Sequence, residues 1–116
     1  IPIHGNGRNI RFYLSAVDFA NALIFLVKKR EKGIYNIGSN FFEKNINIAR
    51  HICKIFKKNP KKFIKFTDDR LYNDKRYSVS SKKIQKLGWR PKRNLLKDLP
   101  MIVEWYKKNY KIFKKI

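Results

Sequence analysis

Short β-favouring runs alternate with amphipathic segments along this chain, and this alternation is the strongest constraint on its fold. Residues 10–14, 34–38 and 63–66 are predicted strands, because they are rich in apolar and aromatic side chains or alternate with period two. Apolar residues at spacings of three and four predict helices over residues 16–27 and 45–56. This order predicts an α/β fold. Strands this short make a poor sheet by themselves, so we expect them to need a larger sheet to pair with.

The rest of the chain is predicted to be mainly helical. One of the two serines at residues 80–81 can cap a short helix that ends at Gly88. The last helix runs through residues 102–106, and Pro100 inside its apolar pattern predicts a start near Lys97 or a kink. The helix that begins near residue 45 is predicted to present one apolar face, formed by Ile48, Ile52, Ile55 and Phe56.

The charge balance is strongly basic, with 29 Lys and Arg residues against 8 acidic ones and a formal net charge of +21. Taken alone, this excess suggests a nucleic-acid-binding module, which remains an alternative. Lysine is spread along the whole chain, however, rather than concentrated in one helix or stripe. We therefore interpret the charge as a compositional drift toward lysine on solvated faces, and do not expect nucleic acid as a partner.

Length and cysteine content narrow the class of protein further. A chain of 116 residues forms one domain at most, and its 43% hydrophobic content is enough for a modest core. A single cysteine, Cys53, rules out an internal disulfide and a cysteine-based zinc site, which fits a reducing compartment and predicts a cytoplasmic location. The sequence contains no apolar run of about 18 residues, so no membrane span is predicted. Since Ile1 opens the chain and Met101 is its only methionine, we expect a fragment.

Two glycines, Gly5 and Gly7, resemble part of a dinucleotide-binding loop. That loop needs a third glycine, where Ile10 stands here, followed by a helix and by an acidic residue about twenty positions later. A strand-like segment follows instead. We therefore predict a tight turn in which residues 5–7 adopt positive φ angles.

No catalytic, metal-binding or cofactor-binding residue is predicted in this chain. Tyr110 and Lys114 have the Tyr-x-x-x-Lys spacing of short-chain dehydrogenases, but they lie in a lysine-rich tail without a cofactor loop, so we reject them as a catalytic pair. His4 and His51 show no spacing typical of metal ligands or of a catalytic triad.

The segment TDDRLYNDKRY, residues 67–77, is the strongest candidate for a binding loop. It combines acidic, arginine and tyrosine side chains directly after a predicted strand, where α/β proteins commonly bind ligands. Arg70 and Arg76 have the side-chain chemistry to fork onto phosphate oxygens. The alternative is a solvated loop with local Asp–Arg pairs.

Five motifs follow one another in the order PIHGNGRNIRFYL, GIYNIGSN, DRLYNDKRY, KKIQKLGWRPK and IVEWYKKN. Together they resemble the C-terminal part of the nucleotide-sugar 4,6-dehydratases, which act on dTDP-glucose or UDP-glucose and belong to the extended short-chain dehydrogenase group. The resemblance covers residues 2–109. The form Asn73-Asp74-x-Arg76-Tyr77 is closer to the UDP-glucose enzymes than to the bacterial dTDP-glucose enzymes.

The resemblance implies a reaction in which NAD is a recycled cofactor. The C4 hydroxyl of a nucleoside-diphosphate glucose is oxidised, water is eliminated across C5 and C6, and the hydride returns to C6, giving the 4-keto-6-deoxy sugar. In this family an N-terminal Rossmann part supplies the NAD site and the catalytic groups. Residues 1–116 match only the C-terminal nucleotide-sugar-binding segment, so we expect this chain to be inactive alone and the full-length enzyme to be a metal-free homodimer.

Position by position, the resemblance also implies a set of substrate-binding residues. The set is Pro2, Ile3, His4, Arg11, Asn45, Asp69, Arg70, Leu71, Tyr72 and Asn73. Residues 2–4 match a strand that lines the base and ribose, Arg11 matches a contact to the diphosphate, and Asn45 matches a contact to the nucleotide. Residues 69–73 match a loop that closes on the diphosphate and ribose, with Arg70 as the phosphate ligand.

Three positions depart from the family pattern. Val17 stands where glutamate is common, Leu71 replaces a proline and should leave its loop less rigid, and Pro100 lies in a helix that the family keeps free of proline. Another UDP-sugar-modifying short-chain dehydrogenase, an epimerase or a decarboxylase, is the alternative within the same group. The motif at residues 73–77 and the Gly88-Trp89 context argue against it.

Overall fold

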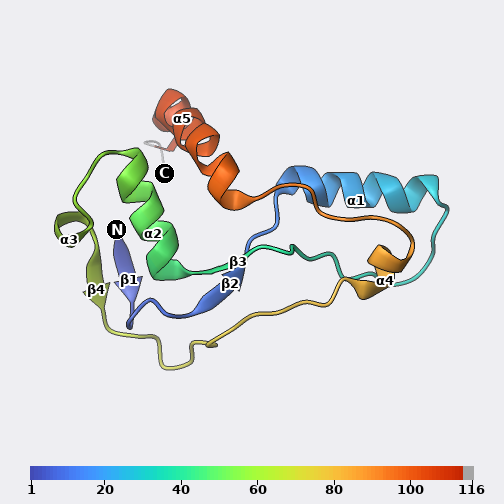
Figure 1. Ribbon diagram of the computed structural model, residues 1–116, viewed down its shortest axis with the longest axis horizontal. Helices are drawn as coiled ribbons and strands as arrows, with labels where there is room; N and C mark the ends of the chain where they lie inside the picture. Colours follow the sequence, from blue (N-terminus) through green and yellow to red (C-terminus); the bar gives the residue numbers. More distant parts are fainter. Residues whose placement is uncertain (114–116) are drawn as a thin grey trace.

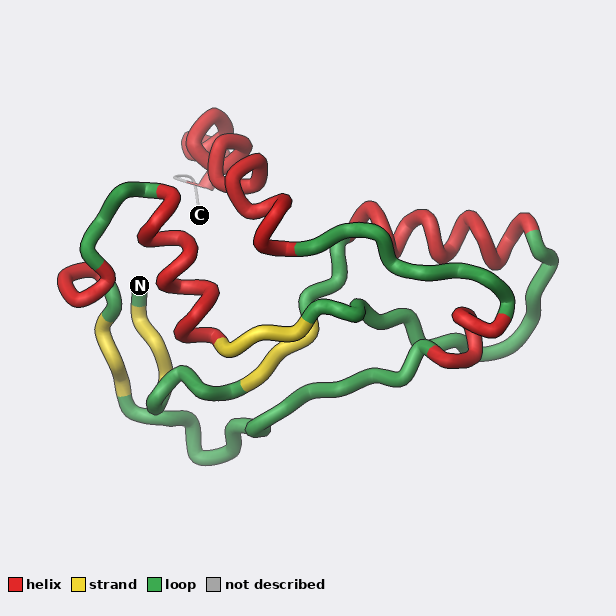
Figure 2. Tube along the Cα trace, viewed as in Figure 1, coloured by secondary structure: helices red, strands yellow, loops and turns green. Residues whose placement is uncertain are grey.

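The chain folds into an elongated molecule of helices and short strands. The computed structural model describes residues 1–113 and measures 50 × 35 × 27 Å. In chain order, its elements are β1 (Pro2–His4), β2 (Ile10–Phe12), α1 (Ala16–Lys28), β3 (Phe42–Lys44), α2 (Asn45–Ile55), α3 (Pro60–Phe63), β4 (Lys65–Thr67), α4 (Lys82–Lys86) and α5 (Leu95–Phe113). Figure 1 shows β1, β4, α2 and α3 at one end and α1 with α4 at the other, and Figure 2 shows the long loops that connect them. The predicted α/β class is confirmed.

Two small sheets organise the N-terminal end. β1 pairs in parallel with β4, which places Ile3 opposite Phe66, and β2 pairs antiparallel with β3. Because parallel strands need a crossover connection, the chain between β1 and β4 returns through α2 and α3. Ile3, Ile46 and Ala49 form a buried cluster between β1 and α2, with Ile64 packed against it. This arrangement fixes β1, where three predicted site residues lie, directly beside α2.

A second buried cluster holds α1 to α4. It consists of Ala22, Ile84 and Trp89, with partly buried apolar side chains from α1 and from residues 35–37 around it. Ser15 begins α1 by accepting a hydrogen bond from the Val17 backbone amide at 3.2 Å. The two clusters share no residue, so each end of the molecule packs around its own small core.

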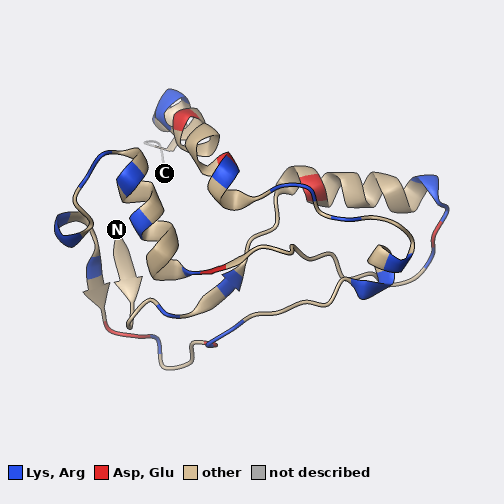
Figure 3. Ribbon diagram, in the orientation of Figure 1, with Lys and Arg blue, Asp and Glu red and all other residues tan. Residues whose placement is uncertain are grey.

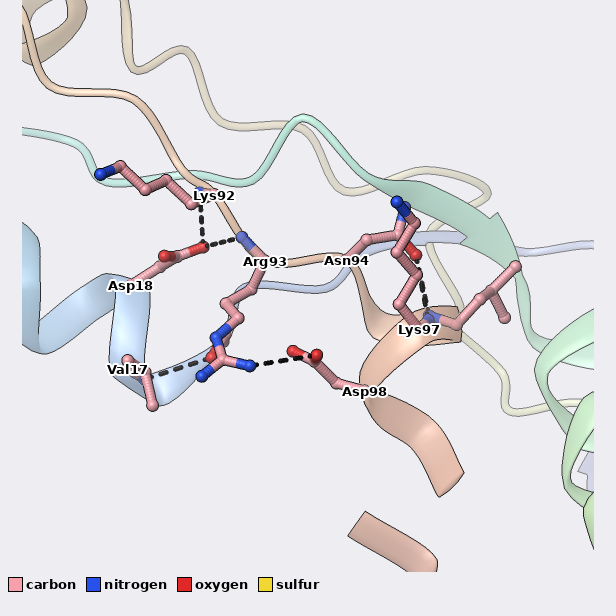
Figure 4. A network of polar contacts seen from close by, with 9 residues as sticks. Val17, Asp18, Lys92, Arg93, Asn94, Lys97 and Asp98 are labelled. Atoms are coloured by element: carbon pink, nitrogen blue, oxygen red, sulfur yellow. Dashed lines mark hydrogen bonds and ion pairs between the residues drawn. The ribbon is translucent and has the colours of Figure 1, made fainter. Parts of the chain in front are cut away.

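Asp18 ties α1 to the chain that precedes α5. Its carboxylate is almost fully buried, and Oδ2 accepts hydrogen bonds from the backbone amides of Lys92 at 3.0 Å and Arg93 at 2.8 Å. Arg93 then pairs with Asp98 in the first turn of α5 at 3.3 Å, as Figure 4 shows. A buried carboxylate is stable here because backbone donors satisfy it.

The predicted strand over residues 34–38 is wrong for this structure. The segment has an irregular backbone, and Ile34 is 88% exposed. Tyr35 and Ile37 are partly buried and pack against the cluster around Ile84. A strand also needs a hydrogen-bonded neighbour, and no strand within residues 1–113 lies beside this segment.

Several helix details also differ from the sequence-based expectation. The fully buried face of α2 is formed by Ile46, Ala49 and Cys53, and not by the four residues predicted from spacing. Residues 60–63 form the helical turn α3, which Asn59 caps. Of the strand predicted over residues 63–66, only the last two residues belong to a strand, β4. The helix α5 begins at Leu95 and continues through Pro100.

Basic side chains are spread over both ends of the molecule. Figure 3 shows them on α2, α3, β2, β4, α4 and α5. None of the helices in the described part of the chain is long and apolar enough to span a membrane.

Candidate functional site

The turn between β1 and β2 places the N-terminal part of the candidate site. Gly5 and Gly7 have φ angles of 56° and 66°, which confirms the predicted turn at these two residues, whereas Asn6 is not in the positive-φ region. A side chain at Gly7 would collide with Ile3 and Ile46, since a Cβ atom there would lie 2.7 Å and 2.9 Å from them. The glycine at this position therefore allows the turn to pack on the core beneath it.

A hollow of about 240 Å³ lies between β1 and α2. Many of the predicted substrate-binding residues line it together, although they come from distant parts of the sequence. They are Pro2, Ile3, His4, Asn45, Arg70 and Asn73. Ile1, Tyr13, Ile48, Ala49 and Ile52 complete the lining. The hollow thus has an apolar floor from α2 and a polar rim from the 67–77 loop.

Arg11 and Arg70 meet at a single atom on that rim. The Oδ1 atom of Asn73 accepts hydrogen bonds from Nη2 of Arg11 at 3.0 Å and from Nη2 of Arg70 at 2.8 Å. Nη1 of Arg11 donates to the carbonyl oxygen of Asp74 at 2.9 Å, and its guanidinium lies 4.5 Å from the centre of the Tyr77 ring. Arg11 therefore holds the 67–77 loop against β2 in addition to facing Arg70.

Asp69 orients Asn73. Its Oδ1 atom accepts hydrogen bonds from Nδ2 of Asn73 at 2.6 Å and from the backbone amide of Arg70 at 2.9 Å. The hydrogen bond from Asn73 is the main reason that the pKa of the Asp69 carboxyl lies below its ordinary value. The contact is therefore present at neutral pH and is lost only as the pH falls through this lowered pKa.

The remaining predicted residues lie in different environments. Leu71 and Tyr72 are 98% and 94% exposed and do not line the hollow. Nδ1 of His4 lies 3.1 Å from the carbonyl oxygen of Asp68, at the start of the loop. Arg76, which sequence chemistry grouped with Arg70, lies instead over the rings of Phe12 and Phe42 at 5.6 and 5.4 Å.

Tyr13 is a rim residue that the sequence analysis did not select. Its hydroxyl donates to Oδ1 of Asn45 at 3.1 Å, and burial raises the pKa of this phenol, so it stays protonated and able to donate. The signal that could have found it is the period-two alternation of residues 10–14, which places Tyr13 on the same strand face as Arg11. Within the described part of the chain, His, Cys, Asp and Glu side chains form no group that could hold a metal ion.

Comparison with known proteins gives this arrangement a family context. No protein-family model matches the chain. The trifunctional UDP-glucose 4,6-dehydratase/UDP-4-keto-6-deoxy-D-glucose 3,5-epimerase/UDP-4-keto-L-rhamnose-reductase RHM2 of Arabidopsis thaliana is 40% identical over 110 residues, which cover 94% of this chain and 16% of that protein. The dTDP-D-glucose 4,6-dehydratase of Homo sapiens is 34% identical over 120 residues, which cover 98% of this chain and 34% of that protein. The chain is a homologue of the nucleotide-sugar 4,6-dehydratases.

Solved structures of dehydratases agree with this relationship. The dTDP-glucose 4,6-dehydratase of Bacillus anthracis in complex with NAD superposes with a TM-score of 0.83 at 31% identity, covering 95% of this chain and 35% of that one. DesIV of Streptomyces venezuelae, a dTDP-glucose 4,6-dehydratase with NAD and TYD bound, gives a TM-score of 0.84 at 26% identity. The predicted kinship with the extended short-chain dehydrogenase fold is thus confirmed. This dehydratase homologue spans about a third or less of the relatives that it matches.

Proposed function

We propose that this chain is the nucleotide-sugar-binding part of an NAD-dependent dehydratase that converts UDP-glucose or dTDP-glucose into the 4-keto-6-deoxy sugar. The hollow beside β1 takes the nucleoside, with Pro2 and Ile3 against the base. Arg11 and Arg70 hold the diphosphate. A homodimeric assembly, which the resemblance supports, and a cytoplasmic location, which the single cysteine favours, belong to the same proposal.

The convergence of two guanidinium groups carries this proposal. Arg11 from β2 and Arg70 from the 67–77 loop donate to one atom at the rim of a hollow of about 240 Å³. Two like charges held this close favour an anion between them, and the guanidinium fork matches phosphate oxygens geometrically. The adjoining lining is mostly apolar, which suits a base and ribose better than a second charged group.

The residues of this chain do not fit the NAD site itself. The turn at residues 5–9 carries two glycines, but the strand β2 follows it, so the turn does not lead into a helix N-terminus that could face a pyrophosphate. No redox step is therefore assigned to this chain. In the proposed enzyme a different part of the protein binds NAD and supplies the acid and base groups, while this chain binds and orients the substrate.

Substitution of the two arginines tests the binding role. We expect Arg11→Ala and Arg70→Ala each to weaken UDP binding to the full-length protein about tenfold or more, because a hydrogen bond to a charged group contributes about 1.5–3 kcal/mol. Calorimetric titration with UDP and TDP measures this. Arg76→Ala is the matched control, since it removes the same charge from the same loop but from a side chain that lies over aromatic rings. Equal affinities in all three variants would refute the diphosphate site.

The reaction itself distinguishes the candidate enzymes. We expect the full-length protein to convert UDP-glucose or dTDP-glucose into a 4-keto-6-deoxy product, which mass spectrometry detects as the loss of one water. An epimerase would give a product of unchanged mass, and a decarboxylase would require a UDP-sugar acid. Either of those outcomes would leave the binding proposal standing and overturn the assignment as a dehydratase.

A further inference from the structure

Asn73 occupies the point between the two arginines where an anion is expected. Its Oδ1 atom lies 3.0 Å from Nη2 of Arg11 and 2.8 Å from Nη2 of Arg70. An amide oxygen carries only a partial negative charge, so it balances two full positive charges poorly. The hydrogen bonds from the arginines to this amide are charge-assisted on the donor side only. A phosphate oxygen at the same point would add a full negative charge, which both guanidinium groups attract more strongly.

The orientation of this amide is fixed from the opposite side. Nδ2 of Asn73 donates to Oδ1 of Asp69 at 2.6 Å, and the same carboxylate oxygen accepts from the backbone amide of Arg70 at 2.9 Å. A carboxylate accepts hydrogen bonds only, so Asp69 must face the NH₂ group of Asn73. The amide oxygen is consequently turned toward the two arginines.

The two arginines are held with unequal strength. Arg11 is anchored independently of Asn73, because Nη1 donates to the carbonyl oxygens of Ile10 and Asp74, both at 2.9 Å, and the guanidinium stacks on Tyr77. For the Arg70 side chain, the hydrogen bond found within residues 1–113 is the one to Asn73. Arg70 is thus the arginine whose position depends on what lies between them.

We propose that Asn73 is a place-holder for a diphosphate oxygen of the substrate. Without ligand, its amide oxygen keeps the Arg70 guanidinium aligned beside Arg11. An entering diphosphate displaces this amide oxygen and accepts the hydrogen bonds of both arginines. This inference rests on the proposed function, since it assumes that the two arginines bind the diphosphate. Alignment before binding lowers the cost of ordering the loop, while the weak neutral acceptor is easily displaced.

Limited trypsin digestion and UDP titration of the full-length protein test the place-holder together. Without ligand, we expect Asn73→Ala to be cleaved after Arg70 at least threefold faster than the unsubstituted protein, since the guanidinium loses its acceptor. At saturating UDP the two rates should become equal, because the phosphate then holds Arg70 in both proteins. A rate difference that persists at saturating UDP would show that Asn73 stays on the arginines and would overturn displacement.

A charged substitution gives the second test. Asn73→Asp puts a carboxylate between the arginines. The variant loses the hydrogen bond to Asp69 and is repelled by that carboxylate, which leaves the two guanidinium groups as its partners. It should therefore fill the anion position and weaken UDP binding at least tenfold. Ser78→Asp is the matched control, because it adds the same charge at an exposed position beyond the loop. Asn73→Ala removes a competing acceptor but also the alignment of Arg70, two effects of opposite sign, so it should weaken UDP binding far less than Asn73→Asp does.

Three further outcomes contradict the proposal, and they are distinguishable. Equal affinities for Asn73→Asp and Ser78→Asp would show that phosphate does not bind between the arginines. A loss of tenfold or more in Asn73→Ala would make Asn73 a direct ligand contact rather than a place-holder. If the unsubstituted, folded protein binds neither UDP nor TDP, the proposed function fails and the place-holder fails with it.

Discussion

A single glycine controls how closely the 67–77 loop approaches β1. Gly5 has a φ angle of 56°, and a Cβ atom on it would lie 2.5 Å from Oδ2 of Asp69. We expect Gly5→Ala to lower the free energy of unfolding by about 1–2 kcal/mol from the left-handed backbone alone. It should also push Asp69 away and release Asn73. Gly88→Ala separates the two effects, since Gly88 has a positive φ but open space around it.

The measurement combines thermal unfolding with trypsin digestion of the full-length protein. Both glycine variants should unfold at a lower temperature, but only Gly5→Ala should be cleaved faster after Arg70. Similar cleavage in the two variants would mean that Asp69 does not depend on the space that Gly5 leaves.

At the scale of single residues, the sequence predicted two phosphate-binding arginines in the 67–77 loop, and one of them lies at the site. Arg70 and Arg76 have the same side chain in the same loop, and only Arg70 lies on the rim of the hollow. The difference comes from the partners of Arg76, the rings of Phe12 and Phe42, which belong to strands remote from it in sequence. Composition and spacing within one loop contain no information about such partners.

Among the elements, α1 depends on one buried carboxylate. We expect Asp18→Ala to destabilise the protein by about 1–3 kcal/mol for each backbone amide that loses its acceptor, here those of Lys92 and Arg93. Asp18→Asn keeps an acceptor oxygen and should cost less. Urea unfolding of the full-length protein measures both.

Glu104→Gln is the control for the loss of a carboxylate charge. Glu104 is exposed and pairs with Lys107 one turn away on α5, so its loss should change stability by less than about 1 kcal/mol. If Asp18→Ala and Glu104→Gln had equal effects, the two amides would be satisfied without Asp18.

The prediction of elements succeeded where the determinants are local. The helices α1 and α2 follow from apolar spacing. The start of α5 was predicted near Lys97 and lies at Leu95, because Oδ1 of Asn94 accepts from the Leu96 backbone amide at 3.0 Å. Residues 34–38 show the limit. Their apolar pattern predicted a strand, but whether such a segment becomes a strand depends on a neighbouring strand that no local pattern contains.

At the scale of the whole molecule, the chain exposes more surface than a self-contained domain. Its accessible surface is 9536 Å², whereas a folded monomer of this mass is expected to expose about 6,700 Å². Its radius of gyration is 17.0 Å, against about 13 Å expected for a compact chain of this length. The excess area is comparable to a large protein–protein interface.

Much of the exposed apolar surface lies on α1. Phe19, Leu23 and Val27 follow one another at spacings of four residues, and each is at least 45% exposed. A helix with apolar side chains on two faces is normally buried on both faces. Residues 34–38 follow α1 after a short loop and pair with no strand within residues 1–113. We therefore expect a further α/β layer, with a strand beside that segment, to cover this face.

Association in trans tests this expectation. We expect the chain to bind a separately produced NAD-binding part, and Phe19→Asp to reduce the amount that co-purifies at least tenfold. Asn21→Asp adds the same charge to an exposed polar position of the same helix and should leave association unchanged. On association, the amides of residues 34–38 should become protected from hydrogen exchange, because a paired strand satisfies them. Rapid exchange of these amides in the complex would show that the partner covers α1 without extending a sheet.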